Sequence, residues 1–211
     1  VLNRFPSGAK HLYPGWTPDG RLSFVRSETG TIMSQVADRG RPPDVVLGGS
    51  RLLPVPHSWS PGAAVVMVTQ STPSTASDIF SLRVADGSLQ PVVQTTFTEY
   101  APALSPDGRW LAYSSDETGR FEVYVQPFPG PGPRRKVSRA GGGEPAWARS
   151  GKELFFREPA DKMMVASIVD GVAQGAPRKL FELPRWTGQM FRTNYDVAPD
   201  GRRFLMIQQR D

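Results

Sequence analysis

Cysteine is absent from this chain of 211 residues, and histidine occurs only twice. The lack of cysteine excludes disulfides, thiolate nucleophiles and cysteine-ligated zinc or iron–sulfur sites. No stretch reaches the roughly 20 apolar residues of a membrane span, and no signal peptide is visible at Val1. Because the chain begins at Val1 instead of a methionine, we expect a processed or excised piece.

The sequence motifs of the common enzyme classes are also missing. There is no G-x-S-x-G elbow, no H-E-x-x-H, no P-loop and no EF-hand loop. The kinase Gly-rich loop, H-R-D and D-F-G are absent as well. We therefore expect no catalysis by this chain, no cofactor and no metal site.

Glycine and proline, with 21 residues each, are abundant, and they gather in a repeated turn. The clearest copy is Ser105-Pro106-Asp107-Gly108, which separates two apolar runs. Proline presets φ for a type I turn, aspartate tolerates the next position, and glycine takes the positive φ that closes a hairpin. We interpret Ser105 and Asp107 as structural, because equivalent residues recur where catalysis would need only one set.

The turn recurs at a nearly constant interval. The residues that open its copies lie 43 to 50 positions apart and are Trp16, Trp59, Leu104, Trp147 and Val197. The turn residues assigned a structural role are Pro18, Asp19, Gly20, Pro106, Asp107, Gly108, Pro199, Asp200 and Gly201. The second copy, Ser60-Pro61-Gly62, lacks the aspartate, and the fourth is degenerate. A period of about 40–45 residues is typical of a β-propeller with four strands per blade.

The predicted fold class is therefore all-β, a propeller of four-stranded antiparallel blades with about five repeat units in this chain. We expect a single domain over residues 1–211, with units that start near residues 12, 55, 99, 142 and 190. Residues 1–5 have the apolar character of an outer strand and are expected to close the last blade. Two architectures stay open: a compact ring of five units with one thin blade, or part of a larger ring.

Several motifs resemble the TolB-type propeller family, and more closely the C-terminal propeller of bacterial membrane-bound serine/threonine kinases. They are Phe97-Thr98-Glu99, Ser105-Pro106-Asp107-Gly108-Arg109-Trp110, Glu122-Val123-Tyr124-Val125, Pro127-Phe128-Pro129-Gly130, Gly141-Gly142-Gly143-Glu144-Pro145 and Gly201-Arg202-Arg203-Phe204. The resemblance covers most of the chain from about Trp59 onward. It implies a larger ring, attachment to a membrane kinase and an extracytoplasmic, periplasmic-side location.

The inner strands of a propeller line its central channel, so polar residues on them are candidate ligand-binding groups. When the units are aligned on their turns, five polar residues lie either three or five positions before the residue that opens the turn. They are His11, Glu99, Glu144, Arg192 and Asn194. On regular strands these side chains would meet at one mouth of the channel. They form either a site for a small ligand or for acid/base chemistry, or the ordinary polar lining of a water-filled channel.

The charge distribution suggests a second kind of site. The net charge is +5, and residues 134–211 hold 15 basic and 9 acidic side chains. This excess predicts either a solvated face or a surface for an acidic partner. Nucleic acid is not expected, because no nucleic-acid-binding motif accompanies the charge.

Two classes of function remain from the sequence. The favoured one is a non-catalytic interaction or sensing module that binds a protein or peptide partner, as part of a larger bacterial protein. The alternative is the propeller domain of a hydrolase related to prolyl oligopeptidase, or a hydrolase or lyase acting at the channel mouth. The residues that flank this segment in the full gene would discriminate between them.

Overall fold

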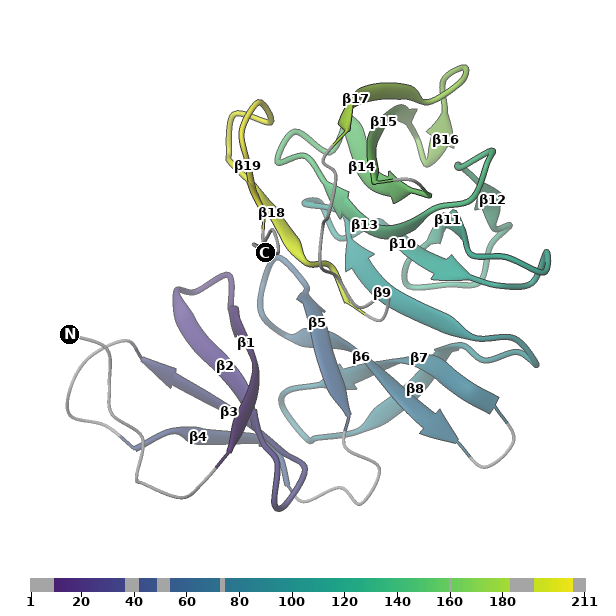
Figure 1. The fold of residues 1–211 in the computed structure, drawn as a ribbon. Helices are drawn as coiled ribbons and strands as arrows, with labels where there is room; N and C mark the ends of the chain where they lie inside the picture. Colours follow the sequence, from purple (N-terminus) through teal and green to yellow (C-terminus); the bar gives the residue numbers. More distant parts are fainter. Residues whose placement is uncertain are drawn as a thin grey trace, which may run out of the picture. The chain divides into compact units, whose positions relative to one another are not determined.

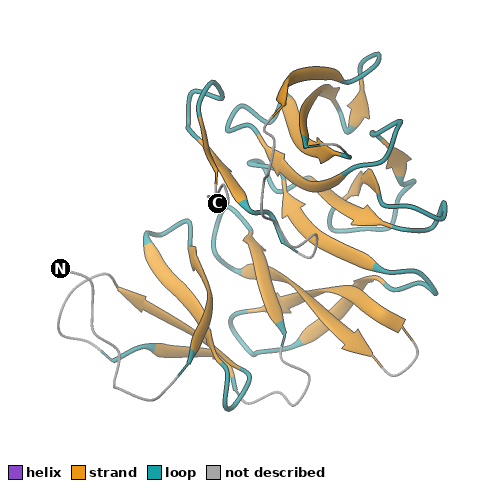
Figure 2. Ribbon diagram, viewed as in Figure 1, coloured by secondary structure: helices purple, strands orange, loops and turns teal. Residues whose placement is uncertain are grey.

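The computed structural model describes residues 10–36, 42–48, 54–72, 75–159, 161–182 and 192–206. These residues form strands, turns and loops without any helix, as predicted (Figure 2). The proposed closing strand at residues 1–5 lies outside the described residues. The chain divides into two compact units, residues 1–94 and 95–211, and each is described by itself.

The first unit consists of two four-stranded antiparallel blades (Figure 1). The strands of one blade are β1 (His11–Trp16), β2 (Arg21–Arg26), β3 (Thr31–Val36) and β4 (Asp44–Leu47). The strands of the other are β5 (Val55–Trp59), β6 (Val65–Thr72), β7 (Thr75–Arg83) and β8 (Leu89–Val93). Val25 and Ile32 of one blade pack with Val66 and Val68 of the other in a buried cluster. The apolar faces of neighbouring strands thus form the core of this unit.

The second unit holds the other predicted repeats. Its first blade contains β9 (Glu99–Leu104), β10 (Trp110–Ser115), β11 (Glu122–Pro127) and β12 (Arg135–Lys136). The next contains β13 (Gly143–Trp147), β14 (Glu153–Glu158), β15 (Lys162–Val169), β16 (Val172–Ala173) and β17 (Arg178–Glu182), with β16 and β17 both paired to β15. A last hairpin joins β18 (Tyr195–Val197) to β19 (Phe204–Met206).

Side chains of neighbouring blades interlock within the second unit. Leu154 and Phe156 of β14 join Ala112, Val123 and Val125 of the preceding blade in one buried cluster. The indole Nε1 of Trp147 donates a hydrogen bond of 3.0 Å to the carbonyl of Ala103 in the preceding blade. This bond fixes Trp147, the residue directly before the turn of its blade, against β9, the inner strand of the preceding blade.

The turns between the first two strands share one geometry in both units. Gly20, Gly108, Gly151 and Gly201 have φ of 68° to 78°, and each donates its backbone N–H three residues back. In the second copy the corresponding residue is Ala63, with φ of 55°, and Gly62 takes the place of the aspartate. The sequence had suggested Gly62 as the glycine of this turn. The hydrogen-bond pattern assigns that position to Ala63 instead.

The inner strands are irregular at one equivalent point. Tyr13, Ala101 and Glu144, each three residues before the residue that opens the turn, have φ of 59°, 49° and 57°. The pairing with the second strand shifts register around all three residues. A left-handed residue of this kind marks a β-bulge, which interrupts the alternation of side chains. Residues on either side of the bulge therefore do not share the face that regular alternation along the strand predicts.

Candidate functional site

The predicted channel residues lie in both units. His11 belongs to the first unit, where its ring meets Phe24 edge-on at 5.0 Å. Glu99 is fully buried in the second unit, and one carboxylate oxygen accepts hydrogen bonds from Thr95 and Ser115. The structure brings Glu144 and Asn194 into direct contact. Arg192 joins this pair through its backbone, because its carbonyl accepts a bond of 2.7 Å from the Asn194 amide.

Glu144 is the centre of a buried polar cluster. One carboxylate oxygen accepts a bond of 2.5 Å from Arg157, whose other terminal nitrogen lies 3.2 Å from Asp161. The second oxygen accepts from the backbone N–H of Asn194 at 2.8 Å. The hydroxyl of Tyr195 donates to the Glu144 carbonyl, also at 2.8 Å. The cluster thereby attaches the start of β18 to β13 and β14.

Burial governs the ionisation of this cluster. The Glu144 side chain is 2% exposed, and burial raises its pKa above the ordinary value. The hydrogen bonds from Asn194 and the charge of Arg157 oppose this increase only in part. Burial likewise raises the pKa of the Tyr195 hydroxyl, which lies in the same cluster. A carboxyl group with a raised pKa is suited to acid/base chemistry, although structural clusters produce the same shift.

A cavity of about 470 Å³ opens beside Glu144, at the point where the chain enters β13. Its walls come from Asp116 and residues 119–121 of one blade and from residues 141–144 and 157–159 of the next. A Cβ at Gly142 would lie 2.8 Å from the Cβ of Ser138. Close packing therefore explains the glycine at this position without reference to a ligand.

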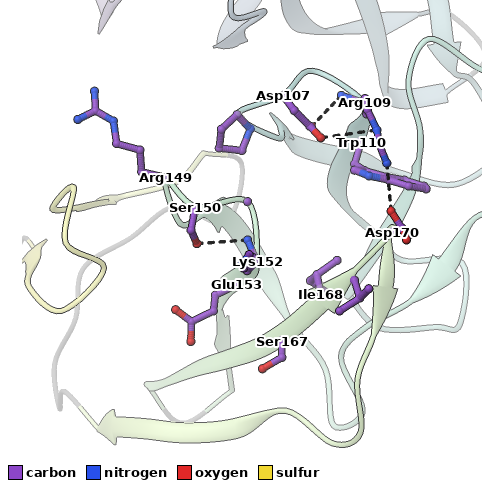
Figure 3. Close-up of a pocket in the computed structure, with 14 residues that line it drawn as sticks. Asp107, Arg109, Trp110, Arg149, Ser150, Lys152, Glu153, Ser167, Ile168 and Asp170 are labelled. Atoms are coloured by element: carbon purple, nitrogen blue, oxygen red, sulfur yellow. Dashed lines mark hydrogen bonds and ion pairs between the residues drawn. The ribbon is translucent and has the colours of Figure 1, made fainter.

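A larger groove of about 880 Å³ lies at the other end of the same two blades. This turn-side groove is lined from three segments, within residues 106–110, 149–153 and 167–171 (Figure 3). In this view Arg149 and the ion pair of Arg109 with Asp170 mark opposite ends, and Lys152 and Glu153 lie between them. The groove offers charged groups of both signs around an apolar floor.

Sequence reasoning did not find the turn-side groove. It had treated the turn at Ala148-Arg149-Ser150-Gly151 only as a degenerate repeat, and it had not used the dipeptide Asp170-Gly171. Both residues of that dipeptide have positive φ, 45° and 69°, as in the two-residue hairpins that asparagine or aspartate followed by glycine favours. The dipeptide was a usable signal for a hairpin, but its position against Trp110 depends on tertiary packing.

Two further properties concern possible ligands and membranes. Among the described residues, no group of three or more histidine, aspartate or glutamate side chains is placed to hold a metal ion. The same residues contain no helix long and apolar enough to cross a bilayer.

Comparison with known proteins supports the fold. No protein-family model matches the chain. A curated relative, an uncharacterized protein from Agrobacterium fabrum, is 22% identical over 92% of this chain and 83% of its own length.

Solved structures resemble the chain more clearly than sequences do. TolB from Acinetobacter baumannii matches 95% of this chain with a TM-score of 0.66 and 18% sequence identity. A structure assigned to TolB from Agrobacterium tumefaciens matches 96% of the chain with a TM-score of 0.64 and 20% sequence identity. Oligogalacturonate lyase from Vibrio parahaemolyticus matches 92% of this chain with a TM-score of 0.64 and 12% sequence identity. The chain spans 55%, 91% and 57% of these proteins, respectively. Its blades thus have the TolB-like propeller fold, which hosts more than one function.

Proposed function

We propose that this chain is a non-catalytic propeller module that binds a protein or peptide partner. We further propose that it is the C-terminal part of a bacterial membrane-bound serine/threonine kinase, as its motifs suggest. The observation that carries the binding role is the contrast between the two candidate sites. The Glu144 carboxylate is buried in contacts within the fold, whereas the turn-side groove is bordered by the exposed Arg149 and Lys152.

The contacts of the polar groups support a binding role over catalysis. Both oxygens of Glu144 accept hydrogen bonds that hold β14 and β18 in place. The hydroxyl of Ser105 donates to Asp107 at 2.6 Å and accepts the backbone N–H of Trp110 at 2.9 Å. The turn thus uses the serine and the acid that would be the obvious catalytic pair.

The full reading frame that contains this segment tests the kinase proposal. A kinase domain followed by a membrane-spanning helix upstream supports it. A G-x-S-x-G motif in a hydrolase domain downstream refutes it and indicates a peptidase related to prolyl oligopeptidase. The binding role is tested separately by assaying the purified chain against ester, peptide and oligogalacturonate substrates, for which we expect no turnover.

A lyase or hydrolase acting beside Glu144 is the second candidate. Its support is the raised pKa of Glu144 next to Arg157, both of which line the 470 Å³ cavity, together with the structural likeness to an oligogalacturonate lyase. A carboxyl group whose pKa is raised by burial keeps its proton to a higher pH than an exposed one and can then act as a general acid. Turnover that disappears in Glu144→Gln, while the fold stays intact, would replace the binding proposal with this one.

A further inference from the structure

The floor of the turn-side groove is apolar and fixed in place. The ring of Trp110 packs against the backbone of Gly171, where a Cβ would overlap its carbon atoms. Val169 borders the groove with 57% of its surface exposed. Val172, its partner across the hairpin, is 38% exposed. Exposed branched side chains of this kind are typical of contact surfaces for apolar groups.

Some of the charged side chains around this floor have ion-pair partners in the groove, and others do not. Arg109 lies 3.6 Å from Asp107 and 3.2 Å from Asp170, so it neutralises carboxylates of the groove itself. The third carboxylate of the lining, Glu153, faces Arg178 at 4.0 Å. Arg149 and Lys152, which flank Ser150 and Gly151 on one exposed turn, have no ion pair within the part of the chain that is described. The groove therefore presents two cations that a ligand could neutralise.

We propose that the turn-side groove binds an acidic peptide segment of a partner protein, with carboxylates at Arg149 and Lys152 and an apolar side chain against Trp110 and Val169. This inference rests on the proposed binding function and assigns that function to a surface and a ligand class. The volume of about 880 Å³ lies within the range of sites that enclose a ligand. The excess of basic residues in 134–211 would also attract an acidic partner over longer distances.

The carboxylates of the lining favour a peptide over a nucleic acid. Asp107 and Asp170 share the single guanidinium of Arg109, so a negative charge remains at that end of the groove and would repel a continuous row of phosphates. A peptide can place single carboxylates at the cations and apolar side chains elsewhere. Discrimination between these ligand classes is therefore part of the test.

The test begins with a random library of capped synthetic heptapeptides, presented to the full chain at 50 and 300 mM NaCl. We expect enrichment of peptides that place aspartate or glutamate next to leucine, phenylalanine or valine. The dissociation constant of the best peptide is then measured for the parent chain and for Arg149→Glu/Lys152→Glu. We expect this double variant to weaken binding at least tenfold. Val169→Ser should weaken binding by a smaller factor.

Arg139→Glu is the matched control. Arg139 is an exposed arginine that precedes β13, whereas Arg149 follows this strand, so the two lie at opposite ends of it. We expect binding within twofold of the parent, and circular dichroism should show an intact fold for every variant. The matching peptide with glutamine in place of its acidic residues should bind at least tenfold more weakly than the parent peptide.

Several results would overturn the proposal. These are no enrichment, enrichment of basic or purely polar peptides, equal weakening by Arg139→Glu, or tighter binding of a single-stranded oligonucleotide of the same charge. These results are distinct from failure of the proposed function. Turnover of a substrate would refute the non-catalytic role of the chain, whatever the turn-side groove binds. A chain with neither turnover nor selective peptide binding refutes only the assignment of the groove.

Discussion

The ring of Trp110 occupies the space that a side chain on Gly171 would need. The two residues are 61 positions apart in the sequence and belong to neighbouring blades of the second unit. Gly171 is the second residue of a hairpin in which it and Asp170 both have positive φ. The contact places the hairpin on the ring, and Arg109, whose guanidinium lies 5.9 Å from the same ring, is paired with Asp170.

Gly171→Ala should therefore destabilise the fold and displace Trp110. We expect a loss of about 2–3 kcal/mol in the free energy of unfolding, from the positive φ and from overlap with the ring. Gly175→Ala is the control, because Gly175 has φ of 77° and nothing within 4 Å of its Cβ position. It should lose only about 1 kcal/mol, from the positive φ alone. Equal losses in urea unfolding would show that the contact with Trp110 has no energetic weight.

Ala63→Gly should stabilise the chain. Ala63 has φ of 55° at the position where the other turns of this type have glycine. A left-handed alanine costs about 1–2 kcal/mol, and the entropy that glycine adds to the unfolded chain offsets part of the relief. We expect a net gain of about 0.5–1 kcal/mol in urea unfolding, and the reverse sign for Gly108→Ala. A lower stability of Ala63→Gly would contradict this account of the turn.

Gly108→Val should be much more damaging than Asp107→Ala. Gly108 has φ of 72°, a conformation that is severe for a β-branched residue. Asp107 accepts bonds from Ser105 and from the Arg109 backbone, and its loss should cost about 1 kcal/mol. Thermal melts that rank the two variants in the opposite order would show that the turn is held in another way.

Glu144 should make the chain less stable as the pH rises. Because burial raises its pKa in the folded state, the unfolded chain ionises first. The free energy of unfolding then falls between the ordinary pKa near 4.5 and the higher folded value, and stays constant above it. Glu144→Gln should remove this fall, seen as a flatter curve of stability against pH from 4 to 8. A curve with the slope of the parent would contradict the raised pKa.

Glu122 should show the opposite dependence. Burial, the largest single influence, would raise its pKa, but hydrogen bonds from Ser138 and Arg120 and the charge of Lys136 outweigh it and lower the pKa. Its stabilisation is present above pH 4.5 and is lost as the pH falls through the lowered folded pKa. Glu122→Gln should cost about 1.5–3 kcal/mol at pH 7 and less at pH 3. A cost independent of pH would show that the contacts of Glu122 do not depend on its charge.

The closing strand proposed at residues 1–5 remains a prediction, because it lies outside the described residues. We expect residues 1–5 to pair with the last unit, within one chain or across a dimer. Their deletion should cost at most about 1 kcal/mol per lost ladder bond and should increase aggregation. A deletion variant that melts and sediments like the parent would exclude this closure.

The sequence alone determined the class of fold and the spacing of the blades. A proline that presets φ and a glycine that accepts positive φ act over four residues, so turns such as the one at Pro106 and Gly108 can be predicted locally. The apolar runs between the turns then predict strands, and a regular period predicts blades.

The tertiary structure decided which polar side chains are buried in contacts and which stay exposed. The bulge at Glu144 turns this side chain toward Arg157 and Asn194, and no regular strand pattern contains that information. The turn-side groove depends on the packing of Trp110 against Gly171 and on which carboxylates already face an arginine. Such contacts join residues far apart in the sequence, so the pattern of strands and turns fixes neither the burial nor the pairing of these groups.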